Sequence, residues 1–211
     1  MEELNVCTWV WGSKYGRDYV ERLFAGLHRH LKRPFTPWVF HPNEADYHLT
    51  QTPGCFARLR LFDPMFQRKH GLKGRAVCLD LDLIITGELD PLFAKPEPFG
   101  ILQGVNNHKG RFNGSLWWTT VGYRPDVWSD FSLEAATAVP HAEFPDDQAW
   151  FEAKMPDAGA LGSQDGAYAF MKPGWTTGDK LPSDARLVAF PGKRDPSQFT
   201  HLEWVRKHWA A

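Results

Sequence analysis

RAVCLDLDLIITGELDPLF, residues 75–93, is the most strand-like stretch of the chain. Its apolar residues fall on both faces, which is typical of a central parallel strand. Two carboxylates, Asp80 and Asp82, interrupt this run two positions apart. Because side chains alternate along a strand, we expect both carboxylates to point to the same side. Aspartates in an apolar setting are costly unless something positive meets them, so the pattern requires a basic side chain or a metal ion.

The place of the two carboxylates favours a metal ion. In open α/β sheets, ligands bind in the crevice beyond the carboxyl ends of the parallel strands. Two hard oxygen ligands there suit Mg²⁺ or Mn²⁺, with a diphosphate completing the coordination. In the alternative interpretation, one aspartate caps the following turn and the other pairs with Arg or Lys. The apolar strand before the pair and the segment ITGELDPLF after it favour the metal.

The rest of the chain predicts one α/β domain over residues 1–211, with a mixed central sheet flanked by helices. Strand and helix patterns alternate early, and hairpin-like strand pairs follow later. Strands are predicted at 4–11, 37–42, 74–85, 98–105, 113–122 and 185–192. Helices are predicted at 16–31, 55–63, 125–139, 146–155 and 198–210, with Pro64 giving a kink or a new helix start.

Composition narrows the class of protein. The net charge of -1 provides no global attraction to nucleic acid or to anionic lipid. Three cysteines lack metal-type spacing, so we expect reduced thiols and a cytoplasmic location. The N-terminus has no signal pattern, and no apolar run is long enough to span a membrane. Ten tryptophans are mostly expected in the core, although exposed ones often line carbohydrate-binding surfaces.

Together, these motifs resemble the GT-A nucleotide-sugar glycosyltransferases, and most closely the family-8-type retaining enzymes. A strand, Asp-Leu-Asp, a polar turn and LDPLF are similar to the metal-binding motif of that family. The resemblance implies a Rossmann-like GT-A fold, a hexosyltransferase activity, a UDP-sugar donor and Mn²⁺ or Mg²⁺. It makes Asp82 the direct metal ligand. It also implies that Asp80 contacts the ribose, the metal or both.

Two further segments resemble the parts of that family that hold the donor. TWVWGSKY is similar to the first strand and loop, where backbone groups and a tyrosine meet the uracil; this implies uracil contacts at Thr8, Trp9 and Tyr15. FARLRLFDPMF is similar to a helix whose arginine reaches the donor, which implies that Arg58 clamps the sugar or phosphate. A salt bridge from Arg58 to the region of Asp80 is an equally good interpretation, and both can hold.

Two more segments imply residues near the reacting sugar. RFNGSLWW is similar to the FNAG segment beside the donor sugar, which implies a role for Asn113 and Gly114. DDQAW is similar to a helix start near the reaction centre, which implies a role for Asp147 and Gln148. Either Asp146 or Asp147 is expected to cap the helix while the other projects into the site. That carboxylate would orient the acceptor hydroxyl, or act as general base if the reaction were inverting.

Trp117 and Trp118 follow in the same strand and are predicted on opposite faces. One of them is expected in the core. The other is a candidate for stacking on a sugar.

The last segment departs from the family pattern. AFPGKRDP stands where the family has HFxGxxKPW, so the third metal ligand, a histidine, aligns with Ala189. The phosphate-binding lysine aligns with Asp195. Gly192 is retained, with Lys193 and Arg194 beside it. Either the two aspartates hold the metal with diphosphate and water while one of these cations neutralises the phosphate, or metal binding is weak and the cations act more strongly.

The leading hypothesis is therefore a metal-dependent glycosyltransferase that moves a sugar from a UDP-sugar to a hydroxyl group with retention. The acceptor can be a glycan, a small molecule, a protein or a modified DNA base. A nucleotidyltransferase of similar fold would carry a glycine- and basic-rich loop after the first strand, and WGSKYGRD matches this poorly. A catalytically inactive carbohydrate- or nucleotide-binding relative is the third hypothesis, because the histidine is missing and tryptophans are many.

Overall fold

The structure is a computed structural model, and it describes residues 3–41, 54–106 and 110–211. The strands are β1 (Leu4–Trp9), β2 (Phe35–Phe40), β3 (Arg75–Leu79), β4 (Leu83–Ile85), β5 (Phe99–Gln103), β6 (Phe112–Thr120), β7 (Gly159–Leu161), β8 (Ala167–Ala169) and β9 (Leu187–Ala189). The α-helices are α1 (Arg17–His30), α2 (Pro64–His70), α3 (Asp90–Phe93), α4 (Asp126–Ser129), α5 (Leu133–Ala138), α6 (Asp147–Lys154) and α7 (Glu203–His208). Three 3₁₀ helices are η2 (Gly54–Phe62), η3 (Ser163–Asp165) and η4 (Pro196–Phe199).

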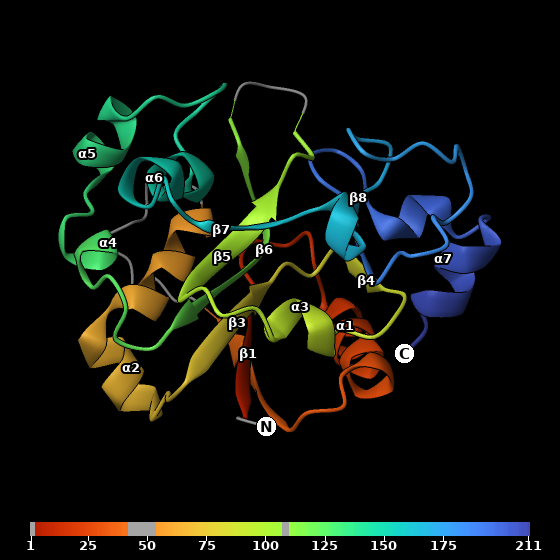
Figure 1. Cartoon of the computed structure of the whole chain (residues 1–211), viewed down its shortest axis with the longest axis horizontal. Coiled ribbons are helices and arrows are strands. Elements are labelled where there is room, and N and C mark those ends of the chain that lie inside the picture. Colours follow the sequence, from red (N-terminus) through yellow and green to blue (C-terminus); the bar gives the residue numbers. More distant parts are fainter. Residues whose placement is uncertain (1–2, 42–53, 107–109) are drawn as a thin grey trace.

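The main sheet has six strands in the order β2-β1-β3-β6-β5-β7. Strands β1, β2 and β3 run parallel, and β6 pairs antiparallel with both β3 and β5. Helices lie on both sides of this sheet (Figure 1). The mixed α/β sheet flanked by helices confirms the predicted fold class.

Alternation along the central strands builds two separate cores. Val6 and Val77 pack on the face that α1 covers, whereas Cys7 and Cys78 pack on the face that η2 and α6 cover. Both faces are therefore apolar, as a central parallel strand requires. Among the described residues the cysteines, Cys7, Cys55 and Cys78, are all free thiols, as expected.

The predicted strand over 74–85 is wrong, because the chain turns at 80–82 and enters a second sheet. That sheet has the order β4-β9-β8, and its far side packs on α7. Leu83 of β4 pairs antiparallel with Ala189 of β9. Helix α1 lies close to β4, since a Cβ added at Gly26 would stand 3.2 Å from Ile85. The interruption therefore places the two carboxylates where the main sheet ends and the second sheet begins.

Three predicted helices differ from the structure. Residues 125–139 form two short helices: α4 ends at Ser129 with Asp130 as its C-cap, and Ser132 caps the start of α5 by accepting a hydrogen bond from the Ala135 amide at 3.0 Å. The closing helix over 198–210 likewise divides into η4 and α7. The helix predicted over 55–63 is present but is a 3₁₀ helix.

The strand predicted over 37–42 begins two residues earlier, at Phe35, and ends at Phe40. Its last predicted residue, Pro42, lies outside the described residues. The strand predicted over 185–192 is the shorter β9, and the three-residue strands β7 and β8 were not predicted. No helix in the described part of the chain has the length and apolarity to cross a membrane.

Candidate active site

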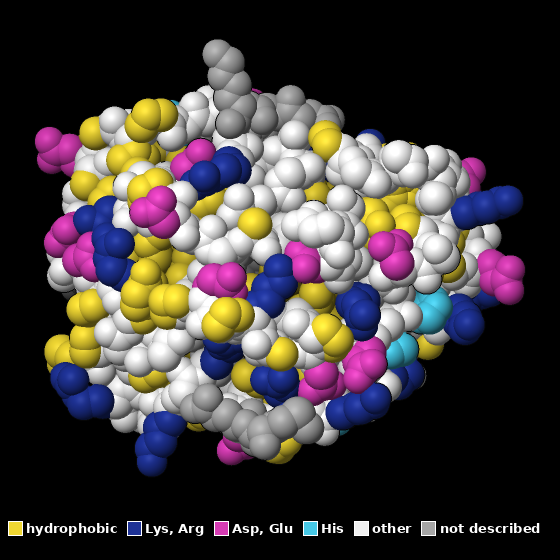
Figure 2. Space-filling view, viewed as in Figure 1, with side chains coloured by type: hydrophobic (Ala, Val, Ile, Leu, Met, Phe, Trp, Pro, Cys, Tyr) yellow, Lys and Arg dark blue, Asp and Glu magenta, His cyan; other side chains and the backbone are white. Residues whose placement is uncertain are grey.

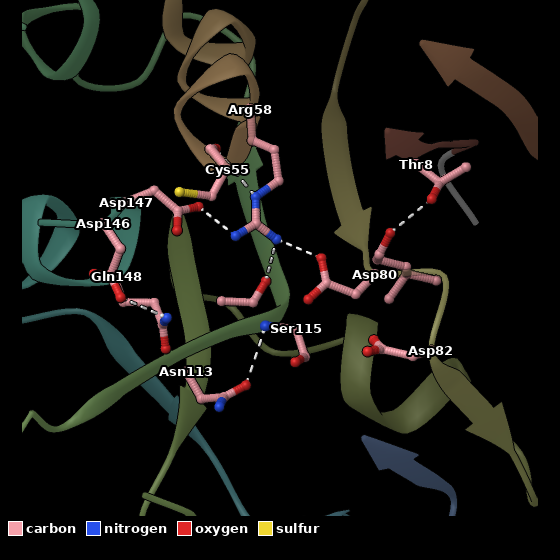
Figure 3. Close-up of polar contacts among 12 residues, drawn as sticks. Thr8, Cys55, Arg58, Asp80, Asp82, Asn113, Ser115, Asp146, Asp147 and Gln148 are labelled. Carbon is pink, nitrogen blue, oxygen red and sulfur yellow. Dashed lines mark hydrogen bonds and ion pairs between the residues drawn. The ribbon is translucent and has the colours of Figure 1, made fainter. Parts of the chain in front are cut away.

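The two aspartates lie in the turn that follows β3. The Asp80 amide donates to the Ser115 carbonyl of β6 at 3.0 Å, and the Asp82 carbonyl accepts from the Phe190 amide at 3.2 Å. These backbone bonds tie the turn to both sheets. Both carboxylates point toward the side where Ser115 lies (Figure 3). The predicted common orientation is therefore present, although a turn and not a strand produces it.

Arg58 is the centre of a buried ion-pair network. Its Nη1 donates to Asp80 Oδ1 at 2.5 Å and to the Gly114 carbonyl at 2.8 Å, while Nη2 lies 2.6 Å from Asp147 Oδ2 (Figure 3). Arg58 is only 4% exposed and Asp147 is fully buried. The predicted salt bridge from Arg58 to Asp80 is thus present. Arg58 therefore fixes the position of the Asp80 carboxylate.

Burial dominates the electrostatics of this network. It raises the pKa of Asp147 to about 7, although the Arg58 guanidinium opposes the rise. Burial alone would lower the pKa of Arg58. The carboxylates of Asp147 and Asp80 outweigh this effect and raise the pKa above its ordinary value. Removing a partner from such a cluster leaves an uncompensated buried charge, which is strongly unfavourable.

Gly114 is a glycine because of the network beside it. A Cβ at this position would stand 2.7 Å from Arg58 Nη2 and 3.2 Å from Gln148 Cγ. The nearest atom belongs to a side chain that is held by Asp147, so it cannot simply move aside. The absence of a side chain at Gly114 therefore lets the backbone of β6 approach Arg58 closely.

The start of α6 separates the roles of its two aspartates. Asp146 caps the helix, because its Oδ1 accepts from the Ala149 amide at 2.8 Å and its Oδ2 from Gln148 Nε2 at 2.9 Å. Asp147 turns inward to Arg58. Its carboxylate is fully buried and pairs with Arg58, so it does not face solvent.

Asn113 is held by its own strand. Its Oδ1 accepts from the Ser115 amide at 3.1 Å, and its Nδ2 donates to Asn106 Oδ1 at 3.1 Å. The side chain is buried next to Gly114 at the start of β6. Gly114 lies against both Arg58 and Gln148, and Asn113 precedes it in β6.

Asp82 has a different set of partners. The Tyr15 hydroxyl donates to Asp82 Oδ2 at 2.6 Å, and Lys14 Nζ lies 3.9 Å from the same oxygen. Lys14 also donates to the Tyr15 hydroxyl and lies over the tyrosine ring, 4.5 Å from its centroid. Burial and the neighbouring carboxylate of Asp80 raise the pKa of Asp82 to about 7, against the opposing hydrogen bond from Tyr15.

Thr8 and Trp9 contribute structure through their side chains. The Thr8 hydroxyl donates to the Leu79 carbonyl at 2.9 Å and links β1 to β3. The Trp9 ring packs on Phe40 with centroids 4.6 Å apart. Only their backbone groups are left for the predicted nucleotide contact.

Trp117 and Trp118 lie on opposite faces, as predicted. Both are fully buried in the two cores, so the expectation that one of them stacks on a sugar is wrong. The reason is that β6 is a central strand, covered on both faces.

The C-terminal segment replaces the family pattern with packing and capping residues. Ala189 is buried in β9 opposite Leu83, one residue from Asp82. Asp195 caps η4 and accepts from the Tyr19 hydroxyl at 2.7 Å. Gly192 adopts φ +76°, and exposed Lys193 follows it in the turn after β9. Within the described residues, Lys193 forms no ion pair.

The chemistry of the two carboxylates fits a hard divalent cation. No group of three or more His, Cys, Asp or Glu side chains is arranged to hold a metal within the described ranges. Asp80 and Asp82 are the two residues that could hold such a cation. Each uses one oxygen for Arg58 or Tyr15 and retains a second oxygen. Mg²⁺ in particular commonly takes one or two carboxylates and fills its remaining positions with water and phosphate oxygens.

No sequence motif identified Lys14 or Tyr19 as residues of this site. Tyr19 packs on Tyr15 with ring centroids 5.0 Å apart and connects it to Asp195. A basic residue next to Tyr15 in the loop after the first strand is the only signal that pointed to Lys14.

Comparison with known proteins supports the fold. No family model matches the sequence, and no curated protein matches it significantly. Among solved structures, a glycosyltransferase involved in the glycosylation of the major capsid of PBCV-1 is similar, with a TM-score of 0.59 and 12% identity. The match covers 95% of this chain and 98% of that chain.

The glycosyltransferase GlyE of Streptococcus pneumoniae TIGR4 is also similar. Its apo form gives a TM-score of 0.63 at 15% identity over 99% of this chain, and a second GlyE structure gives 0.62 at 14% over 98%. This chain spans 63% of the length of the GlyE chains. The protein therefore has a glycosyltransferase fold.

Proposed function

We propose that this protein is a GT-A-type glycosyltransferase that transfers a hexose from a UDP-sugar to an acceptor hydroxyl with retention and with help from Mn²⁺ or Mg²⁺. One observation carries the proposal. Asp80 and Asp82 lie together beyond the carboxyl end of β3, with Arg58 behind them, in a fold shared with glycosyltransferases. This is the place where open α/β sheets bind their ligands.

In the proposed reaction, the bond between the anomeric carbon and the diphosphate oxygen breaks, and its electron pair leaves with UDP. The acceptor oxygen bonds to the anomeric carbon on the same face, and its proton passes to the leaving diphosphate. A divalent cation bound by Asp80 and Asp82 would stabilise the negative charge that develops on the diphosphate.

The residues of the chain orient the donor in this proposal. Arg58 fixes Asp80 and, through its hydrogen bond to the Gly114 carbonyl, the strand beside the sugar. Gln148 and Asn113 face the sugar from α6 and β6. Lys193 is a further cation for the diphosphate, because it is exposed and forms no ion pair within the described residues. The backbone of Thr8 and Trp9 and the ring of Tyr15 are assigned to the uracil.

The proposal is tested by measuring UDP release. Purified protein is incubated with UDP-glucose, UDP-galactose and UDP-N-acetylglucosamine, with Mn²⁺ or with EDTA. We expect release with at least one donor and its loss in EDTA. Asp82→Asn should lose the Mn²⁺-dependent release of UDP, although its side chain can still accept the hydrogen bond from Tyr15. Asp157→Asn, on an exposed loop, is the matched control. Equal release by the Asp82 variant would contradict the metal assignment.

A protein that binds nucleotide-sugars without turnover is a second candidate, and the specific observation for it is Ala189. This buried residue stands beside the Asp82 turn where the family has a metal-binding histidine. The same samples decide between the two functions. A UDP- and Mn²⁺-dependent rise in melting temperature without UDP release from any donor favours binding alone.

A further inference from the structure

A pocket of about 580 Å³ opens between α6, the beginning of β6 and residues 140–142. This volume lies in the range of sites that enclose small molecules. Its walls are largely apolar: Phe112 from β6, Pro140 and Ala142 from the loop, and Ala149 and Ala153 from α6. Such a lining matches a ligand with an apolar body.

Helix α6 opens the pocket by placing small residues on its outer face. Trp150 and Phe151 turn into the core and are buried. Ala149 and Ala153 are four positions apart, so they lie on the same outer face one turn above the other. Because alanine is short, the helix leaves space along this face.

The pocket and the candidate active site share one residue. Gln148 lines the pocket, and its Cγ would lie 3.2 Å from a Cβ at Gly114. Apolar side chains are also visible on the surface over α4 to α6 (Figure 2). Phe144, in the loop that leads into α6, is 56% exposed. A ligand that contacts Gln148 in the pocket would therefore lie beside the candidate active site.

Two carboxylates, those of Asp146 and Glu152, line the pocket together with His141, and no lysine or arginine lines it among the described residues. Both carboxylates are already anchored, since Asp146 caps α6 and Glu152 Oε2 accepts from the Arg111 amide at 3.0 Å. Fixed negative charge disfavours an anionic ligand such as a nucleic acid or an acidic glycan.

We propose that this pocket binds the acceptor, and that the acceptor is a small, uncharged or cationic aromatic molecule with a hydroxyl group. This inference rests on the proposed transferase function, and it narrows the acceptor from four classes to one. A glycan presents hydroxyls on most of its surface and would bury little of the apolar surface of Ala149 and Ala153. An aromatic ring would bury more of this surface.

Direct binding of three matched phenols tests this inference without a donor. Tyramine is cationic, 4-ethylphenol is uncharged and 4-hydroxyphenylacetate is anionic. We expect the first two to bind about tenfold tighter than the third in calorimetry or ligand-observed NMR at low salt. Equal binding of the anionic phenol, or no binding of any of them, would overturn the proposal.

Two variants locate the binding. Ala149→Trp fills the pocket and should weaken tyramine binding about tenfold or more, whereas Ala94→Trp, an exposed alanine after α3, should leave it unchanged. Glu152→Gln keeps an acceptor for the Arg111 amide and should reduce the preference for tyramine over 4-hydroxyphenylacetate. Unchanged binding in Ala149→Trp with a native circular dichroism spectrum, or an unchanged preference in Glu152→Gln, would contradict the assignment.

These measurements also separate the two proposals. Binding of tyramine that is sensitive to Ala149→Trp, without UDP release from any donor, would retain the pocket and reject the transferase. UDP release without phenol binding would retain the transferase and reject the aromatic acceptor.

Discussion

The two aspartates of the Asp-Leu-Asp motif lie two positions apart but in opposite electrostatic surroundings. Asp80 belongs to a buried network with Arg58 and Asp147, in which the charged atoms lie 2.5 to 2.6 Å apart. We call these three residues the arginine cluster. In it, one guanidinium faces two carboxylates.

Asp82 belongs to a second group with Tyr15 and Lys14, which we call the tyrosine cluster. Its side chain is 11% exposed, less than the 26% of Asp80, but its cation is 3.9 Å away on a side chain that is 49% exposed. A hydroxyl group is its closest partner. The charge of Asp82 is therefore matched less closely by a cation than the charge of Asp80 is.

Replacing Arg58 should have the largest effect on stability, so it is the strongest test of this comparison. Arg58→Met keeps much of the volume but leaves Asp147 buried without its partner. We expect a loss of about 3–5 kcal/mol in the free energy of unfolding, measured by urea denaturation. Arg68→Met, in the exposed last turn of α2, should change stability by less than about 0.5 kcal/mol. Equal effects of the two variants would show that the arginine cluster does not hold the fold.

Gly114→Ala tests the same cluster from the neighbouring strand. The added Cβ would push on Arg58 Nη2 at 2.7 Å, so we expect a loss of about 1–3 kcal/mol. Thr120→Ala, at the end of the same strand, is the control for a small change in β6. The double variant with Arg58→Met sharpens the test. If the clash with Arg58 is the cause, Gly114→Ala should cost almost nothing extra in that background.

How far the sequence predicts this architecture depends on element length. Strands β1, β3, β5 and β6 have at least five residues, enough for alternation and β-branched composition to show. Strands β7 and β8 have three residues each, too few to display a period. The turn at 80–82 was missed because apolar residues continue on both of its sides. Pairing of β4 with β9 ends the main strand there, and nothing local in the sequence encodes that pairing.

For the site, local spacing predicted that Asp80 and Asp82 lie together, but not what binds them. The contacts from Arg58 to Asp80 and Asp147 span 22 and 89 positions. A salt bridge from Arg58 to the region of Asp80 was predicted, whereas the pairing of Arg58 with Asp147 was not. The family resemblance did not reveal that Asp147 is buried. Burial depends on how α6 packs on β6 and η2, which is a property of the tertiary structure.

Removing the charge of Asp82 from the tyrosine cluster should raise the stability of the protein, whereas removing a charge from the arginine cluster should lower it. Burial and Asp80 raise the pKa of Asp82 to about 7, so a charged Asp82 is unfavourable for the fold at pH 8. We expect Asp82→Asn to be more stable than the wild type by about 1 kcal/mol at that pH. Asp80→Asn, which loses the charge facing Arg58, should be less stable. Lower stability of Asp82→Asn would mean that both aspartates stabilise the fold, and it would contradict the comparison.

The smallest expected effect comes from an exposed ion pair that resembles the arginine cluster in composition but not in burial. Asp126 lies 2.7 Å from Arg124 and 3.5 Å from Lys154, yet its side chain is 37% exposed. The hydrogen bond from Arg124 lowers the pKa of Asp126 to about 2. Its stabilising contribution is therefore present above the unfolded-state pKa near 4 and is lost as the pH falls toward 2.

Because water and salt screen this pair, Asp126→Asn should cost only a few tenths of a kcal/mol at pH 7, about 0.3. The cost should vanish at pH 2 and in 1 M NaCl, and the exposed Asp157→Asn control should show neither dependence. Urea denaturation of both variants at the two pH values measures this directly. A cost as large as that of Arg58→Met would mean that contact distance, and not burial, sets the strength of ion pairs in this protein. That result would remove the physical basis for treating the arginine cluster as stronger than an exposed ion pair.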